Sequence, residues 1–269
     1  MLSAIHCRFF RQAFAYSIPI GGLGGLIGLG GGEFRLPVLM QVVGFDAKSA
    51  VPLNLMVSLV TLAFALATRG HAAPLTAVTP HLPEIAGLVI GGMASAFHGA
   101  RLVRLLSDER LTTIIAGLLA GIGILLLIEA KFPFQEAGLL PDGGGLHLLV
   151  GVVIGLGIGL VSSVLGVAGG ELLIPSLVFI FGVDIKTAGS ASILISLAIV
   201  GIGLWRYRQM DAFPRGRGAQ RITLAMSGGS LIGAALGGLA VAVAPVVVLK
   251  LLLGGILIAA AGKTILRQR

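Results

Sequence analysis

Eight long apolar stretches, separated by short polar connections, fill most of this 269-residue chain. They cover residues 13–30, 48–68, 83–100, 111–130, 147–167, 187–205, 221–244 and 246–266. Each is close to the length of about 20 apolar residues that an α-helix needs to cross a bilayer. Because lipid cannot satisfy backbone polar groups, such stretches cross a membrane as helices. We therefore expect an all-α, polytopic membrane protein in contact with the lipid bilayer.

The composition excludes the main soluble classes of protein. Hydrophobic residues make up 56% of the chain and charged residues only 11%, with a mean hydropathy of +1.04. An average soluble domain carries about 25% charged residues. Cys7 is the only cysteine, which excludes a disulfide-stabilised scaffold. The net charge of +8 comes from basic residues in the short connections, so it indicates cytoplasmic loops and not a nucleic-acid partner.

An internal repeat divides the chain into two halves. A shift of 138 residues places residues 166–188 on residues 28–50 without a gap, and ten of these 23 positions are identical. The match continues more weakly through Asn54 and Ser192 to Ser58 and Ser196. We therefore predict two repeats of about five segments each, residues 1–130 and 147–269, joined by a connecting loop over 131–146.

The basic residues indicate how the two halves are oriented. If each half crosses the membrane an odd number of times, 13 basic residues lie on the side of the N-terminus and three on the other side. An even number of crossings narrows this difference. Cytoplasmic loops carry the excess of basic residues, so the count favours inverted repeats with both termini cytoplasmic. No clear cleavage site follows Arg8 and Arg11, so we expect a retained cytoplasmic N-terminus and not a removed signal peptide.

Glycine clusters interrupt the apolar pattern at the same place in both repeats. The clusters and the residues after them are Gly30, Gly31, Gly32, Glu33 and Pro37 in the first half, and Gly169, Gly170, Glu171 and Pro175 in the second. Glycine and proline together break a helix. The runs that follow, 34–44 and 172–182, are too short to span a bilayer, so each is expected to be a half-helix that crosses or folds back.

Helix breaks inside a membrane are typical of transporter sites. Backbone N–H groups freed at a break favour anions, and two breaks related by symmetry would meet near the midplane. We therefore predict an anion-binding site formed by the two glycine clusters. The alternative is a pair of kinks that serve only helix packing.

Three charged residues follow the breaks. A charge in the apolar zone costs at least ~2.5 kcal/mol, so Glu33 and Glu171 should be protonated, paired or facing water. A salt bridge or a helix cap near the interface is the alternative. Arg35 has no counterpart, because position 173 is Leu. We predict Arg35 as the counter-ion of an anionic substrate, unless its side chain extends to the membrane surface.

Polar residues also follow the short segments. Asn54 and Ser192 stand about two turns into the next apolar stretch, where they could donate hydrogen bonds to the breaks, assisted by Ser190. Ordinary interhelical hydrogen bonds are the alternative. Asp46 and Asp184 are expected to mark the turns before these stretches. The histidines stand singly, and the sequence predicts no metal site and no cofactor.

The doubled glycine–proline pattern resembles the TauE/SafE sulfite exporter family of bacterial membrane proteins. The matching residues are Gly30, Gly31, Gly32 and Pro37, then Ala168, Gly169, Gly170 and Pro175, where Ala168 departs from the all-glycine form. The resemblance implies export of a small anion, such as sulfite or an organosulfonate, across the cytoplasmic (inner) membrane. Positions 33, 35 and 171 are often apolar in that family, so their charges should alter substrate selectivity.

Together these observations predict a transporter that works by alternating access between its two repeats. Arg35, Asn54 and Ser192 would bind the anion, and a proton on Glu33 or Glu171 is one possible means of coupling. The alternative is an uncoupled, channel-like facilitator for anions or weak acids. The repeats contain no nucleophile–base pair, so we do not expect an enzyme. A homodimer is compatible with the sequence, which does not determine the oligomeric state.

Overall fold

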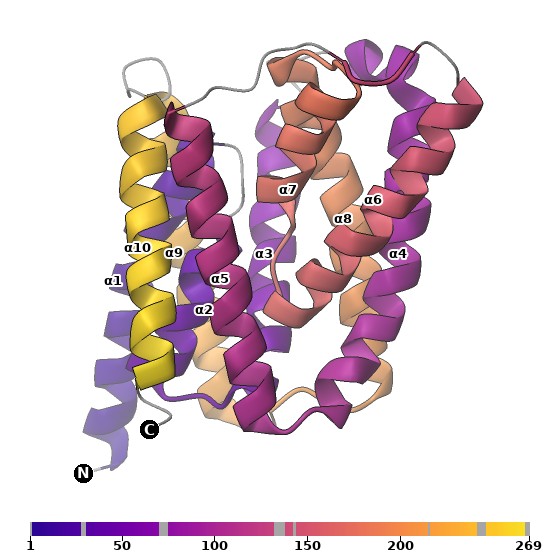
Figure 1. The fold of residues 1–269 in the computed structure, drawn as a ribbon. Coiled ribbons are helices and arrows are strands. Elements are labelled where there is room, and N and C mark those ends of the chain that lie inside the picture. The colour runs from indigo at the N-terminus through magenta and orange to yellow at the C-terminus, as the bar shows by residue number, and fades with distance from the viewer. Residues whose placement is uncertain are drawn as a thin grey trace.

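In the computed structural model the chain forms a bundle of helices (Figure 1). The structure describes residues 2–27, 31–69, 75–131, 138–141, 144–214, 216–240 and 246–266. These residues form helices and no strands, which confirms the all-α prediction. The first half contains α1 (Leu2–Ile27), α2 (Gly32–Val38), η1 (Leu39–Val43), α3 (Ala47–Arg69), η2 (Leu75–His81), α4 (Leu82–Leu105) and α5 (Asp108–Lys131). The second half contains α6 (Gly144–Leu165), α7 (Gly170–Pro175), η3 (Ser176–Ile180), α8 (Ile185–Gln209), α9 (Arg217–Ala240) and α10 (Val246–Leu266).

The long helices fit a membrane. Five stretches of the described residues are long and apolar enough to cross one: Ala47–Ala67, Val78–Leu105, Asp108–Lys131, Gly144–Leu165 and Thr187–Gln209. The other long helices, α1, α9 and α10, coincide with three more of the apolar stretches. Large apolar side chains such as Leu105, Leu149 and Leu224 are exposed on the outside of the bundle, where lipid would cover them. The chain is a multi-pass membrane protein.

The short segments begin earlier than the hydropathy pattern predicts. Helix α2 begins at Gly32 and α7 at Gly170, because the last glycine of each cluster is already helical. After Pro37 and Pro175 each helix widens into a π-helix, η1 or η3. A proline ring removes one backbone donor and clashes with the preceding turn, so a wider turn at this place has a local cause. The 3-10 helix η2 was not predicted from the sequence.

The sequence repeat recurs in the backbone hydrogen bonds. Three bonds of the first half have a counterpart 138 residues later: Arg35 N to Gly31 O (3.3 Å) and Leu173 N to Gly169 O (3.0 Å), Phe45 N to Leu39 O and Val183 N to Leu177 O (both 3.0 Å), Ala50 N to Asp46 O (2.9 Å) and Ala188 N to Asp184 O (2.8 Å). The glycines and prolines therefore impose the same local path on both halves.

The two halves interlock in a symmetric pattern. Helix α1 packs against α9 as α6 packs against α4, and α3 contacts α9 as α8 contacts α4. Helices α5 and α10 pack against each other, as do α3 and α8. A Cβ atom on Gly21 would collide with the backbone of Ser230, and one on Gly159 with the backbone of Gly92, again 138 residues apart. Small residues thus allow the same close helix contact twice. The inverted orientation of the halves stays a prediction.

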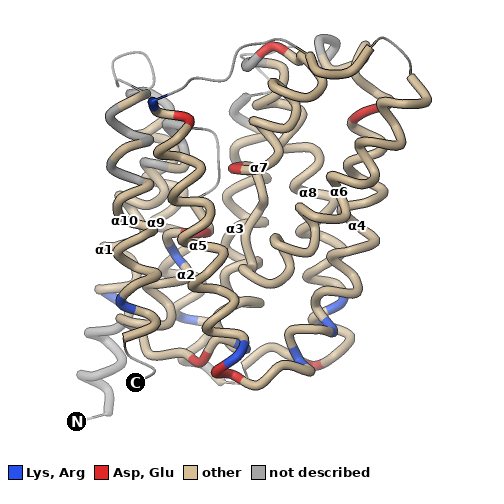
Figure 2. Tube along the Cα trace, viewed as in Figure 1, with Lys and Arg blue, Asp and Glu red and all other residues tan. Residues whose placement is uncertain are grey.

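Basic residues gather at one end of the bundle, the end at which the two termini lie (Figure 2). The connection between α4 and α5 lies at this end together with the end of α8. Arg104 Nη1 donates a hydrogen bond to the Met210 carbonyl at 2.5 Å, which ties these two regions together. The molecule therefore has one strongly basic end.

Candidate functional site

Glycines in the left-handed conformation form both helix breaks. Gly31 has φ of 65°, and in the second half Gly166 and Gly169 have φ of 65° and 79°. Residues with a Cβ atom rarely adopt this conformation. A Cβ atom on Gly166 would also collide with the carbonyl oxygen of Val51 in α3. Gly30 lies outside the described residues.

The structure brings the two breaks together at α3. A Cβ atom on Gly32 would lie 3.2 Å from the Cα atom of Val167, so the breaks touch with no room for a side chain. Asn54 joins them. Its Nδ2 donates to the carbonyl of Gly32 at 2.7 Å and lies 3.5 Å from the carbonyl of Leu165 at the end of α6. Asn54 therefore holds the first break against the second.

Arg35 is completely buried beside this contact. Its Nε donates to Asn54 Oδ1 at 3.2 Å, and Nη2 donates to Ser58 Oγ at 2.8 Å. Nη1 donates to Thr61 Oγ1 at 3.5 Å and to Ser230 Oγ at 3.2 Å. The side chain does not extend to the membrane surface, and all four of these acceptors are neutral. We call these four acceptors the arginine cage.

The place that the repeat relates to the arginine cage has no arginine. The residues 138 positions from Arg35, Thr61 and Ser230 are the apolar Leu173, Ile199 and Gly92. Leu173 is fully buried, and Ile199 fills the space that a Cβ atom on Gly92 would need. At the related place these three polar residues are replaced by apolar ones, while Ser192 and Ser196 stand at the positions of Asn54 and Ser58. The sequence analysis identified Arg35 and Asn54 but missed Ser58, Thr61 and Ser230 as partners of Arg35. Extending the 138-residue shift beyond Ser58 would have shown that Thr61 and Ser230 are replaced by Ile199 and Gly92.

Glu33 and Glu171 occupy the first turns of α2 and α7 and are both buried, with 0% and 4% of their surface exposed. Within the described part of the chain, none of their carboxyl oxygens has a hydrogen-bond partner. Each carboxyl interacts electrostatically with the Arg35 guanidinium, and Glu33 also interacts with Glu171. The structure therefore brings both predicted glutamates to Arg35 without forming an ion pair with it.

The predicted serines of α8 lie differently from Asn54. Ser192 is buried, but its hydroxyl donates to the Gly189 carbonyl of its own helix at 2.9 Å and not to a break. Ser190 is also buried. The asymmetry follows from side-chain length, because the amide of Asn54 reaches farther than a hydroxyl at the equivalent position.

Two aspartates cap the helices that follow the short segments, as their positions predict. Asp46 Oδ2 accepts a hydrogen bond from Ser49 N at 3.1 Å, and Asp184 Oδ1 accepts one from Thr187 N at 3.0 Å. These carboxylates satisfy free N–H groups at the beginning of α3 and α8. They fix where the helices begin and lie apart from the arginine cage.

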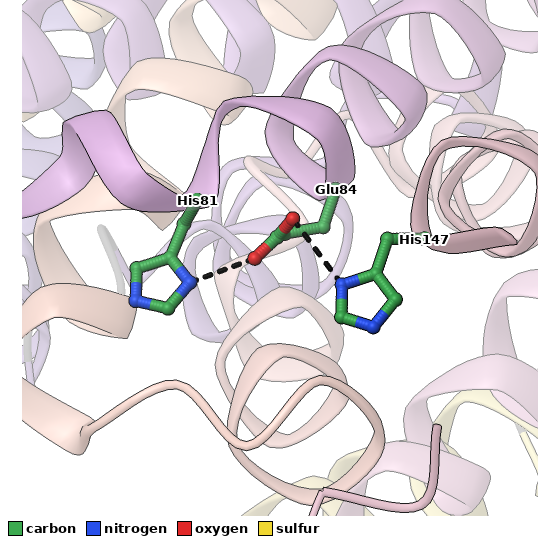
Figure 3. Close-up of polar contacts among 3 residues, drawn as sticks. All are labelled: His81, Glu84 and His147. Atoms are coloured by element: carbon green, nitrogen blue, oxygen red, sulfur yellow. Dashed lines mark hydrogen bonds and ion pairs between the residues drawn. The ribbon is translucent and has the colours of Figure 1, made fainter. Parts of the chain in front are cut away.

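A second polar cluster joins α4 to α6 (Figure 3). His81 Nδ1 lies 2.7 Å from Glu84 Oε1, and His147 Nδ1 lies 3.5 Å from Glu84 Oε2. The His147 ring also packs edge-on against Phe181, with ring centroids 5.6 Å apart. The histidines stand singly in the sequence, but helix packing brings His147 to Glu84 from 63 positions away.

In this histidine–glutamate cluster two imidazoles contact one carboxylate, and the side chains do not surround a common point as metal ligands do. The imidazoles approach opposite oxygens of this carboxylate, and no group of three or more His, Cys, Asp or Glu side chains among the described residues is arranged to hold a metal ion. Glu84 itself is nearly fully buried. The cluster thus fixes α4 against α6.

Removal of the Glu84 carboxylate should weaken this cluster. We expect Glu84→Ala to lower the free energy of unfolding by about 1–3 kcal/mol, because two imidazole nitrogens lose their partner at a buried position. Thermal unfolding in detergent, followed by size-exclusion chromatography, measures the change. Asp108→Ala, at an exposed acidic position, is the control and should change stability by less than about 0.5 kcal/mol. Equal stability of both variants would contradict a role for the cluster in stability.

Comparison with known proteins gives one match. The family model described as sulfite exporter TauE/SafE matches residues 13–264, nearly the whole chain. No curated protein and no solved structure matches the chain. The matched region includes both helix breaks and the whole arginine cage.

Proposed function

Since this chain belongs to the TauE/SafE sulfite exporter family, whose members are membrane transporters, we propose that it exports a small anion across the bacterial cytoplasmic membrane. The observation that carries this proposal is Arg35, a fully buried cation where two broken helices meet. A buried charge in a membrane protein is expensive and usually serves function. By family membership, sulfite or an organosulfonate is the best candidate substrate.

Arg35 and the residues beside it would bind the anion. The guanidinium supplies positive charge, and its planar set of N–H donors matches the oxygens of a sulfonate or sulfite group. In this structure the Arg35 guanidinium donates four hydrogen bonds to the side chains of the arginine cage. The arriving anion would take over some of them, while Asn54 and the freed backbone N–H groups of Gly31, Gly32, Gly169 and Gly170 would contribute further donors. Ser190 and Ser192 would complete the site from α8.

Alternating access would move one repeat against the other around this site. Glu33 and Arg35 have no exposed surface, so the site is closed in the present conformation. Coupling to protons, carried by Glu33 or Glu171, is part of this proposal. The basic end of the bundle would face the cytoplasm, in keeping with the positive-inside rule.

Anion flux into proteoliposomes tests the proposed function. Purified protein would be offered sulfite, sulfonates, thiosulfate and small carboxylates, with empty liposomes as the control. Saturable flux of a sulfur oxyanion or a sulfonate is the expected result. The alternative function, a channel-like facilitator, predicts flux that does not saturate and ignores an imposed pH gradient. Absence of flux for every anion from folded protein would contradict the proposal.

A further inference from the structure

Two buried carboxyl groups lie at the site proposed to bind an anion. Glu33 and Glu171 come from equivalent turns of α2 and α7, and both are at least nine-tenths buried. In their ionised form none of their four oxygens has a hydrogen-bond partner among the described residues, although the two carboxyl groups lie close enough to share a hydrogen bond when one of them is protonated. An ionised carboxylate that is buried without donors is very unfavourable. The arrangement therefore favours a proton on the pair, since one carboxyl group can then donate to the other.

The charges at this site do not balance if every group is ionised. Among the described residues, the charged groups that act on Glu33 are Glu171 and Arg35. The groups that face Arg35 from α3 and α9 are the neutral side chains of the arginine cage. One arginine and two ionised glutamates would leave one net negative charge in a buried place, which would also repel an anion.

Protons resolve both difficulties. One proton on the pair of carboxyl groups makes the empty site neutral and turns a carboxyl oxygen into a donor. When a monovalent anion then binds near Arg35, a second proton on the remaining carboxylate restores neutrality. The protonated carboxyl groups can donate hydrogen bonds to the anion, which the ionised groups cannot.

We propose that Glu33 and Glu171 form a proton-binding pair and that a monovalent anion crosses together with one proton. This inference rests on the proposed function and specifies its coupling. Transport of a monovalent anion is then electroneutral, so in liposomes a pH gradient drives it and a membrane potential does not. Export from a cell would follow the outward gradient of the anion itself.

The main experiment separates the two driving forces in proteoliposomes. In one arm, an acidic exterior is imposed at zero membrane potential, set by valinomycin with equal potassium on both sides. In the other arm, a potassium gradient imposes a potential at equal pH. The transported anion is the one that gives saturable flux, and a trapped pH dye reports protons. We expect anion accumulation at least tenfold higher in the first arm, with about one proton for each monovalent anion.

Glutamine variants test the residues themselves. Glu33→Gln and Glu171→Gln keep the side-chain size but cannot exchange a proton, so each should reduce the pH-driven flux at least tenfold and lower the proton-to-anion ratio. Glu84→Gln, in the histidine–glutamate cluster, is the matched control and should keep the ratio near one. A second measurement needs no substrate: infrared spectra of the protein should contain a protonated-carboxyl band at neutral pH that the double variant E33Q/E171Q lacks.

The outcomes distinguish failure of the proton coupling from failure of the proposed anion transport. Voltage-driven anion flux without proton movement would overturn the coupling and leave the anion transporter in place. Flux that requires sodium would likewise replace the proton by another cation. Absence of any anion flux from folded protein would contradict the proposed function itself, and loss of coupling in Glu84→Gln alone would assign the protons to the histidine–glutamate cluster instead.

Discussion

Replacing Arg35 with leucine is expected to lower the free energy of unfolding by about 3–5 kcal/mol and to abolish anion transport. Among the described hydrogen bonds, Arg35 is the only donor to the hydroxyl oxygens of Thr61 and Ser230, and the substitution removes it. It also leaves Glu33 and Glu171 without a compensating cation. Thermal unfolding in detergent and anion flux in proteoliposomes measure the two effects separately.

The internal repeat supplies a compensated variant. The residues related by the repeat to Arg35, Thr61 and Ser230 are Leu173, Ile199 and Gly92, so the triple variant R35L/T61I/S230G copies an arrangement that already occurs in the molecule. We expect this variant to recover part of the stability lost in Arg35→Leu, because two of the four polar acceptors are then replaced by apolar residues while Asn54 and Ser58 remain. Transport should remain absent. Transport by the triple variant would contradict a role for Arg35 in anion binding and leave it a purely structural residue.

Gly166→Ala is expected to prevent accumulation of the folded protein. Its φ of 65° costs a residue with a Cβ atom about 1–2 kcal/mol. The added Cβ atom would also collide with the carbonyl oxygen of Val51, so α3 would have to move away from the second break. Fluorescence-detected size-exclusion chromatography of the expressed protein measures the loss.

Gly157→Ala is the matched control for this change. Gly157 lies in α6, close to Gly166 in sequence, and a Cβ atom there would have nothing within 4 Å. Alanine at this position should fold normally, because it fits an exposed helical site and favours the helix by up to about 1 kcal/mol. If Gly166→Ala folds as well as Gly157→Ala, the close approach between the second break and α3 is not required.

Local features of the sequence predicted most of the architecture. The lengths of the apolar stretches predicted the long helices, and the glycine clusters with Pro37 and Pro175 predicted the two breaks and the short helices after them. Asp46 and Asp184 were expected to mark the turns before α3 and α8, and the structure adds that they cap these helices. These features depend on near neighbours in the chain, because helix breaks and caps are decided within a few residues.

Boundaries were predicted less well than the elements themselves. Helix α1 begins at Leu2 and not near residue 13, and the short helices begin at the last glycine of each cluster. Hydropathy cannot locate these ends, because a polar or glycine-containing turn can still be helical when the rest of the helix supports it.

The sequence by itself determined that this protein is a helical membrane protein made of two similar halves, each with a break that carries a glutamate. Only the tertiary structure decided which side chains meet there. Ser230 reaches Arg35 from 195 positions away, and His147 reaches Glu84 from the other half of the chain. Such contacts depend on how helices dock through small residues such as Gly21 and Gly159. The spacing of residues along one helix carries no information about the partner that another helix brings to it.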